Sequence, residues 1–120
     1  MEEEVKTLVN KIILASQDKK AKNIVTVDMS NLLGSICQYF VICEANSTTQ
    51  IAAIADNIEN QVKKELKERP ISVEGLKESR WVGIDYGTVI VHVFIPELRE
   101  FYDIEHLWED AILEYIPDLD

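Results

Sequence analysis

The side chains best suited to acid–base or metal chemistry in this sequence are its two histidines, His92 and His106, and its two cysteines, Cys37 and Cys43. Histidine titrates near neutral pH and is a common metal ligand. However, no Cys, His or carboxylate spacing around these residues matches a zinc site, so we predict no bound metal. Two cysteines are too few for a secreted disulfide framework. Cys43 ends an apolar run and is predicted to be a buried thiol.

Nucleophilic or phosphate chemistry would need residue patterns that the sequence lacks. It contains no Walker loop and no dinucleotide-binding fingerprint, and Ser47 has no evident base beside it. We therefore predict that the protein is not an enzyme and needs no cofactor.

The segment from Trp81 to Ala111 has the most specific pattern in the chain, and it points to recognition. It combines a hairpin around Asp-Tyr-Gly (85–87), a strand that is apolar on both faces, and an aromatic-rich region. Alternation along the strand places Val89, Val91, Val93 and Ile95 on one face and Thr88, Ile90, His92 and Phe94 on the other. If helices cover only one side of the sheet, the other side exposes an apolar patch or meets a partner, and the second set is the candidate for that side.

Three residues of this segment allow two interpretations each. His92 is either a satisfied core histidine or a contact residue, and Trp81 at the start of its strand fits both roles. Trp108 lies on an apolar stripe, which favours core packing over contact.

Arg99 and Tyr102 belong to residue types that are enriched at binding hot spots. The alternative is structural: Arg99 pairs with Glu100, Asp103 or Glu105, and Tyr102 is left half-buried. The acidic residues that follow would form a solvated face or suit a basic partner.

The rest of the chain supplies the elements that hold this segment. Hydrophobic periodicity predicts a helix over 3–19, strands over 23–28 and 38–43, and a second helix from a cap at Asn46 and Ser47 to about Arg69. An edge strand at 71–73 and hairpin strands at 81–85 and 88–95 follow, and Pro96 opens a final helical region. The apolar face of that region would be Ile104, Leu107, Trp108, Ala111, Ile112 and Tyr115. This order predicts an α/β (α+β) fold, with a mixed sheet of about five strands and helices mainly on one face.

Composition narrows the class of partner. The chain has 120 residues and a hydrophobic fraction of 47%, so we expect one domain, residues 1–120, with a real core. Its net charge is -10. Such a charge repels phosphate and disfavours direct binding to nucleic acid or an anionic membrane, whereas it attracts a basic protein. The acidic N-terminus is unlike a signal peptide, and no apolar run reaches the roughly 20 residues of a membrane span. We expect a cytoplasmic location.

Many residues of the recognition segment also follow the signature of a known family. They are Trp81, Asp85, Gly87, His92, Phe94, Arg99, Phe101-Tyr102-Asp103, Glu105, Leu107-Trp108 and Asp110-Ala111. Upstream, YFVIC (39–43), NSTTQIAAIADNI (46–58) and Glu74-Gly75 agree as well. The chain thus resembles the bacterial ribosomal silencing factors, the Iojap-related family, over nearly its whole length. It departs between Cys43 and Ser47, where family members commonly carry a glycine before the Asn-Ser pair, so no role is carried over to Ser47.

The resemblance implies a repressor of translation. Members of the family bind the large ribosomal subunit through its fourteenth ribosomal protein and sterically block joining of the small subunit when nutrients are limiting. The implied fold is a pared-down nucleotidyltransferase domain, and free members often form homodimers. From this resemblance, and from the second face of the strand in the case of Ile90, we predict eight partner-binding residues: Trp81, Asp85, Ile90, His92, Phe94, Arg99, Tyr102 and Glu105.

Two alternatives remain beside this role. A nucleotidyltransferase relative could retain activity, but such enzymes need a Gly-Ser loop for phosphate and neighbouring carboxylates for Mg²⁺. Neither a Gly-Ser pair nor Asp-x-Asp comes directly after Cys43, and Asp56 and Glu59 lie inside the predicted helix, so retained activity is disfavoured. The second alternative is a homodimeric protein-interaction module without a ribosomal role, which the same apolar patch would serve.

Overall fold

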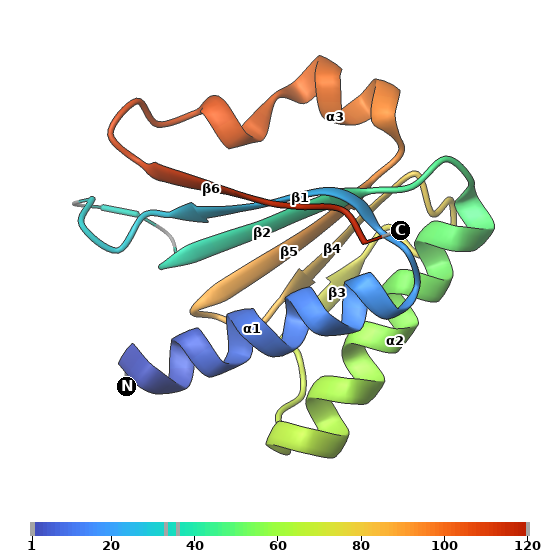
Figure 1. Ribbon diagram of the computed structural model, residues 1–120, viewed down its shortest axis with the longest axis horizontal. Coiled ribbons are helices and arrows are strands. Elements are labelled where there is room, and N and C mark those ends of the chain that lie inside the picture. Colours follow the sequence, from blue (N-terminus) through green and yellow to red (C-terminus); the bar gives the residue numbers. More distant parts are fainter. Residues whose placement is uncertain (1, 33, 36, 120) are drawn as a thin grey trace.

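The computed structural model describes residues 2–32, 34–35 and 37–119 (Figure 1). In this part of the chain, three α-helices, one 3₁₀-helix and six strands follow one another. They are α1 (Glu2–Asp18), β1 (Lys22–Asp28), β2 (Tyr39–Glu44), α2 (Thr48–Leu66), β3 (Ser72–Glu74), β4 (Trp81–Asp85), β5 (Val89–Phe94), α3 (Pro96–Tyr102), η1 (Ile104–His106) and β6 (Ile112–Ile116). The predicted α+β fold with a mixed sheet is confirmed, and the sheet has six strands where about five were expected.

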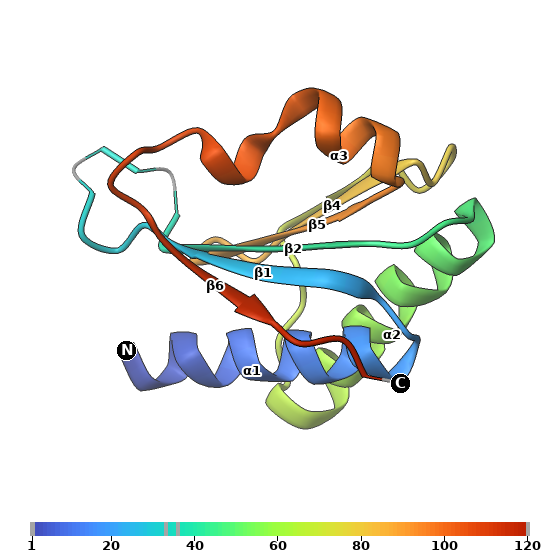
Figure 2. The same cartoon turned by 45° about the horizontal axis from the view of Figure 1, so that its top comes forward.

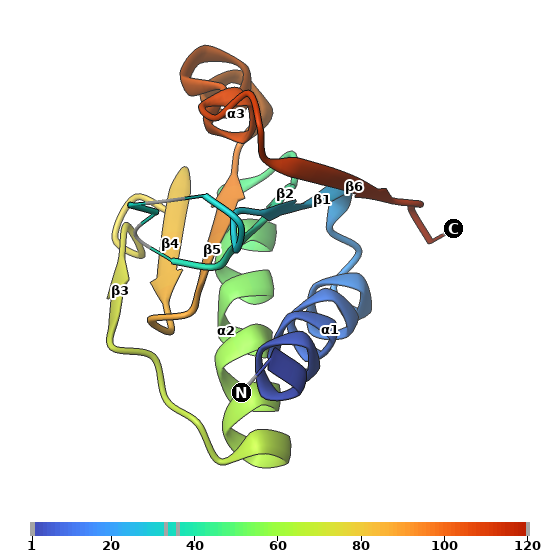
Figure 3. The ribbon, with the colours of Figure 1, turned by 90° about the vertical axis from the view of Figure 1, so that its left-hand side faces the viewer.

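The six strands form one sheet in the order β3-β4-β5-β2-β1-β6. The β2–β5 pair is parallel, and the other four neighbouring pairs are antiparallel. Helices α1 and α2 lie against one face of the sheet, and α3 lies across the opposite face (Figures 2 and 3). The two long helices therefore share one face, as predicted, and the other face is left to the short α3 and the chain that follows it.

Helix α2 begins and ends where the local chemistry predicts. The Ser47 hydroxyl accepts a hydrogen bond from the Gln50 N–H at 3.1 Å, which confirms the predicted N-cap. At the other end Lys67 is left-handed (φ 58°), and its N–H donates to the carbonyl of Lys63. Within the described residues, no helix is both long enough and apolar enough to cross a lipid bilayer.

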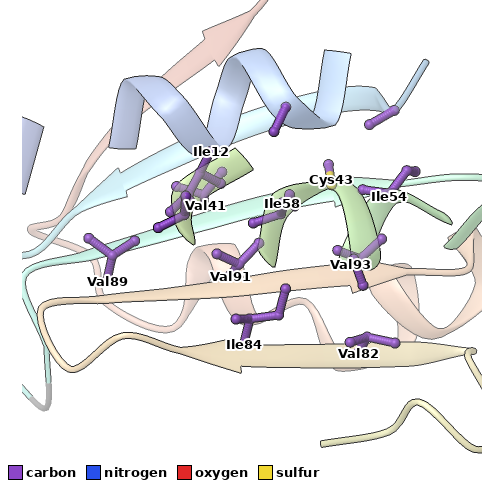
Figure 4. Packing of buried hydrophobic residues seen from close by; sticks show 14 of the residues in the cluster. Ile12, Val41, Cys43, Ile54, Ile58, Val82, Ile84, Val89, Val91 and Val93 are labelled. Atoms are coloured by element: carbon purple, nitrogen blue, oxygen red, sulfur yellow. The ribbon is translucent and has the colours of Figure 1, made fainter. Parts of the chain in front are cut away.

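The face beneath α1 and α2 holds the larger core. Its central residues, all fully buried, are Ile12 of α1, Ile54 and Ile58 of α2, Val41 and Cys43 of β2, Val82 and Ile84 of β4, and Val89, Val91 and Val93 of β5 (Figure 4). Complete burial of such a side chain contributes about 1.5–3 kcal/mol, so this layer holds the long helices on the sheet. Cys43 is the free, buried thiol that was predicted, and burial raises its pKa to about 12.

The opposite face carries a second, smaller core. Its buried members are Val25, Val27, Met29, Cys37, Phe40, Ile42 and Phe94. Leu98 of α3, Ile104 of η1 and Trp108 pack against it while remaining partly exposed. As favoured from the sequence, Trp108 packs against a core, with its ring 5.6 Å from that of Phe40. Both apolar faces of β5 therefore enter a core, but this second face is covered incompletely.

The C-terminal region corrects the prediction. A single helical region from Pro96 to Tyr115 is wrong, because α3 ends at Tyr102 and residues 112–116 pair antiparallel with β1. Asp103 ends the helix: it is left-handed (φ 46°), and its N–H donates to the Arg99 carbonyl. The apolar spacing fits a helix, but the open edge of β1 offers backbone partners, and tertiary pairing overrides local pattern.

Two residues of the expected helical face illustrate the difference. Leu107 and Ile112, which the helix would have buried, are both exposed. Leu113, which lies opposite Val27 in the sheet, packs into the smaller core instead.

Candidate partner-binding surface

An open groove lies on the second face of the sheet, at its β3–β4 end. It measures about 410 Å³ and is lined by Ser72, Glu74, Gly75, Trp81, Gly83, Asp85, Ile90 and His92. Strand alternation explains this lining, since the residues that β3, β4 and β5 contribute all point to the same side of the sheet. Among the residues that the structure describes, none from α3 lines the groove.

Gly83 makes the groove hollow. It pairs with Glu74 of β3 on one side and with His92 of β5 on the other, so a side chain here would stand in the middle of the groove. A Cβ added to Gly83 would meet no atom closer than the Val91 carbonyl oxygen, at 4.0 Å. Glycine inside a strand costs about 0.5–1 kcal/mol relative to alanine. The sheet itself therefore has no need of glycine at this position, and what the glycine preserves is space.

Trp81 and His92 form one wall of the groove. The indole N–H of Trp81 donates to Nδ1 of His92 at 3.1 Å, so the neutral imidazole carries its proton on Nε2. Burial lowers the pKa of His92 to about 4, which keeps the ring neutral at physiological pH. The ring also packs edge-on against Phe40, with centroids 4.8 Å apart. The ring of His92 thus belongs both to the core and to the groove wall. It is not the satisfied core histidine of the first interpretation, because among the described residues its buried Nε2 has no hydrogen-bond partner.

An aromatic ridge, defined as Trp81, Tyr102 and Phe101, rises from this wall. Trp81 stacks on the buried ring of Phe94 at 4.8 Å and contacts Tyr102 at 4.9 Å. Tyr102 in turn meets Phe101 edge-on at 5.0 Å. Exposure grows along the ridge: Tyr102 is 48% exposed and Phe101 is 77% exposed. Large aromatic side chains that pack on buried residues are the usual anchors of protein interfaces.

Arg99 lies apart from the ridge and is buried in an ionic latch. Its Nε donates to Glu105 at 2.8 Å, and one Nη donates to Glu44 at 3.0 Å and to the Asn23 carbonyl at 2.6 Å. The latch, defined as Arg99, Glu44, Glu105 and the Asn23 carbonyl, joins α3 to β1, β2 and η1. Arg99 therefore fixes the helix that carries Phe101 and Tyr102.

The structure divides the eight predicted partner-binding residues into three groups. Four line the groove: Trp81, Asp85, Ile90 and His92. Tyr102 stands beside Trp81 on the ridge, and Phe94 lies fully buried beneath it. Arg99 and Glu105 pair with each other in the latch, which is the structural alternative that the sequence allowed.

Two features of this surface were absent from the predicted set. Phe101 sits next to Tyr102 in the signature, and its high exposure could not be read from spacing. Gly83 did give a signal, because an isolated glycine inside a strand often marks a close approach or a hollow.

The groove is acidic at its rim. Glu74 and Asp85 line it, and no lysine or arginine does so among the described residues. One oxygen of Asp85 accepts the Gly87 N–H at 2.7 Å, which ties the carboxylate to the hairpin turn. Such a rim, beside the face of an indole ring, suits a cationic or hydrogen-bond-donating side chain.

The second histidine, His106, does not line the groove. His106 is exposed and hydrogen-bonded to Asp103, which raises the pKa of the imidazole. Over the described ranges, no group of three His, Cys, Asp or Glu side chains converges in a way that could hold a metal ion.

Comparisons with known proteins agree with one another. A family model described as "Ribosomal silencing factor during starvation" matches residues 2–120. The ribosomal silencing factor RsfS of Bacillus subtilis is 41% identical over 109 residues, covering 88% of this chain and 86% of that protein. A mouse protein named mitochondrial assembly of ribosomal large subunit protein 1 is 34% identical over 73 residues, 58% of this chain and 32% of that protein. A crystal structure of a Chromobacterium violaceum protein matches with a TM-score of 0.80 at 33% identity, covering 87% of this chain and 85% of that one.

Proposed function

Because this chain belongs to the ribosomal silencing factor family, we propose that it binds the large ribosomal subunit through its fourteenth ribosomal protein and blocks joining of the small subunit. The family assignment confirms the resemblance found in the sequence. The particular partner and the blocking mechanism come from that resemblance. The name of the mouse relative, which refers to the large ribosomal subunit, supports the choice of subunit. In this role the protein lowers translation when nutrients are limiting.

The observation that carries the proposal is the groove over Gly83 with the aromatic ridge beside it. Phe101 and Tyr102 expose large apolar rings, whose burial is favourable by roughly 25 cal/mol per Å². The adjoining groove offers a pocket for one side chain of the partner. A ridge beside a pocket is the arrangement expected at the centre of a protein interface, where a few anchors supply most of the affinity.

Electrostatics favour a basic protein at this site. The whole chain carries a net charge of -10, and the groove itself contributes the carboxylates of Glu74 and Asp85. Opposite charge on the partner would speed association and fix its orientation. A basic ribosomal protein meets this requirement.

Silencing of this kind needs occupancy of the subunit interface and no chemical step. The chain measures 36 × 34 × 28 Å, a body that would exclude the small subunit from any surface on which it sits. We therefore assign it no catalytic activity and no cofactor, and a homodimer of the free protein is compatible with the role if the dimer releases the ridge.

The test uses a variant that fills the groove without disturbing the fold. Gly83→Val should fold normally, because the Cβ position is free and a β-branched residue suits a strand. We expect wild type to cosediment with purified large subunits and to reduce the fraction that joins small subunits. Gly83→Val should bind at least about tenfold more weakly, a loss of about 1.4 kcal/mol. Thr49→Val, on the exposed surface of α2, is the matched control and should bind like wild type.

Each outcome has a distinct meaning. Wild type that fails to pellet with large subunits at low micromolar concentration would contradict the ribosomal role and favour a homodimeric module. Normal binding by a folded Gly83→Val variant would keep that role and remove the groove from the interface. Nucleotide release with Mg²⁺ above a heat-treated blank would restore the enzymatic alternative.

A further inference from the structure

A compact basic patch lies at the C-terminal end of α2. Lys63, Lys64, Lys67 and Arg69, together with Asn60, line an open groove of about 400 Å³. All four cationic residues are exposed. They are a third of the 12 lysines and arginines in a chain whose net charge is -10, so cationic charge is concentrated here against an acidic background.

Two acidic residues close to the patch in sequence are directed elsewhere. Glu65 pairs with Lys11 of α1, with N and O 3.7 Å apart. Glu68 lines a different cavity, beside Glu4, Val5 and other residues near the start of α1. Asp56, one turn earlier in α2, accepts a hydrogen bond from Asn60 at 3.1 Å but does not itself line the groove. Among the described residues, the groove is therefore lined by four cations and no carboxylate.

The end of α2 builds the patch. Lys67 adopts the left-handed conformation, its N–H donates to the Lys63 carbonyl, and its ammonium group donates to the Lys64 carbonyl at 3.1 Å. This turn ends the helix and brings Arg69 to the same groove as Lys63. Cations in the last turn complement the helix dipole, which accounts for Lys63 and Lys64. Arg69 lies beyond the helix and has no such explanation.

The basic patch and the aromatic ridge lie at opposite ends of the molecule. In Figures 1 and 3, α3 is at the top of the view and the C-terminal end of α2 is at the bottom. The two surfaces can therefore be engaged at the same time by different components of one large assembly.

We propose that the basic patch binds phosphate groups of ribosomal RNA when the chain is seated on the large subunit. This inference rests on the proposed function. The total charge argues against RNA as the primary partner, but it does not describe a local surface with four cations and no acid. Lysine and arginine contacts to phosphate release counterions and add affinity without reading sequence. The ridge would select the protein partner, and the patch would strengthen the same complex.

The experiment compares two variants of equal net charge. The patch variant carries Lys63→Gln, Lys64→Gln and Arg69→Gln. The control carries Lys19→Gln, Lys20→Asn and Lys77→Gln, three exposed positions on other surfaces; asparagine suits Lys20 because its φ is 62°. Affinity of wild type and both variants for purified large subunits is measured from 50 to 200 mM monovalent salt, after melting curves confirm that all three are folded.

Each phosphate contact contributes a slope of about 0.7–0.9 to the dependence of log affinity on log salt. Loss of three contacts should make the slope of the patch variant shallower by about 2.1–2.7. Across this fourfold change in salt, wild type should then lose about 20- to 40-fold more affinity than the patch variant. The control should keep the wild-type slope. Equal slopes for the two variants would overturn the phosphate-binding role alone, whereas wild type that binds no subunits would overturn this inference together with the proposed function.

Discussion

Arg99→Met is predicted to lower the free energy of unfolding by about 3–5 kcal/mol, because it breaks the latch but leaves its acidic partners in place. The guanidinium group makes three short contacts, to Glu105, Glu44 and the Asn23 carbonyl. The side chain of Arg99 is 10% exposed, and those of Glu105 and Glu44 are 11% and 17% exposed. Water can therefore replace the lost partner only in part.

The size of this loss in the free energy of unfolding follows from comparing the removal of Arg99 alone with the removal of all three charged groups of the latch. Two carboxylates that share one guanidinium group lie close together, and without Arg99 they repel each other in a poorly hydrated site. Removal of one member of a buried pair typically costs about 3–5 kcal/mol, whereas replacement of the whole group by neutral residues is often close to neutral. The triple variant Arg99→Met, Glu44→Gln, Glu105→Gln should therefore recover more than half of the loss.

Urea unfolding followed by circular dichroism measures both variants. With a slope of about 2 kcal/mol per molar urea, the Arg99→Met midpoint should fall by about 1.5–2.5 M. Arg80→Met, an exposed arginine next to β4, is the control and should stay within about 0.5 kcal/mol of wild type. A loss below about 1 kcal/mol for Arg99→Met would show that apolar packing alone holds α3 in place. No recovery in the triple variant would show that the unpaired carboxylates are not the source of the loss.

Three further outcomes follow from the same surface. Trp108→Ala should lower the free energy of unfolding by about 2–3 kcal/mol in urea titrations, less than for a fully buried tryptophan, and a near-neutral result would place Trp108 at the interface. Phe101→Ala and Tyr102→Ala should each weaken binding to the large subunit tenfold or more in cosedimentation. Because Phe101 is exposed, Phe101→Ala should keep the melting temperature of wild type. Unchanged binding by both variants would remove the ridge from the interface. The pKa of His92 is lowered from 6.5 to about 4, so as the pH falls the unfolded chain takes up a proton before the folded chain does. Between pH 7 and pH 4 the free energy of unfolding of wild type should therefore fall by about 3 kcal/mol relative to that of His92→Gln. Parallel pH profiles of the free energy of unfolding for the two proteins would contradict this prediction.

The sequence was sufficient for the parts of the fold that rest on local periodicity. The helical stripe of α2, bounded by Ser47 and Pro70, was placed to within a few residues. The continuous apolar run of β2 was expected to be a strand buried on both faces, and it lies centrally between β5 and β1. In both cases neighbouring residues carry the signal, so no knowledge of the tertiary structure is needed.

The features that the sequence did not predict depend on contacts that are distant in sequence. Strand β6 forms because β1, over eighty residues earlier in the chain, offers an open edge. Arg99 resembled a hot-spot residue, but its partners Asn23 and Glu44 are 76 and 55 positions away. No local pattern distinguishes an arginine that contacts a partner from one that closes such a latch.

The choice between core and contact for the second face of β5 was too simple, because the face changes role along its length. At the Phe94 end the strand is covered by Trp81, the first residue of the ridge. At the Ile90 end it lines the open groove, and His92 stands between the two. The hydrogen bond from Trp81 to His92 ties the exposed wall to the buried layer, so the groove is held in shape before any partner arrives. A wall that is already ordered loses little conformational entropy on binding, and this preorganisation favours a tight complex on a small surface.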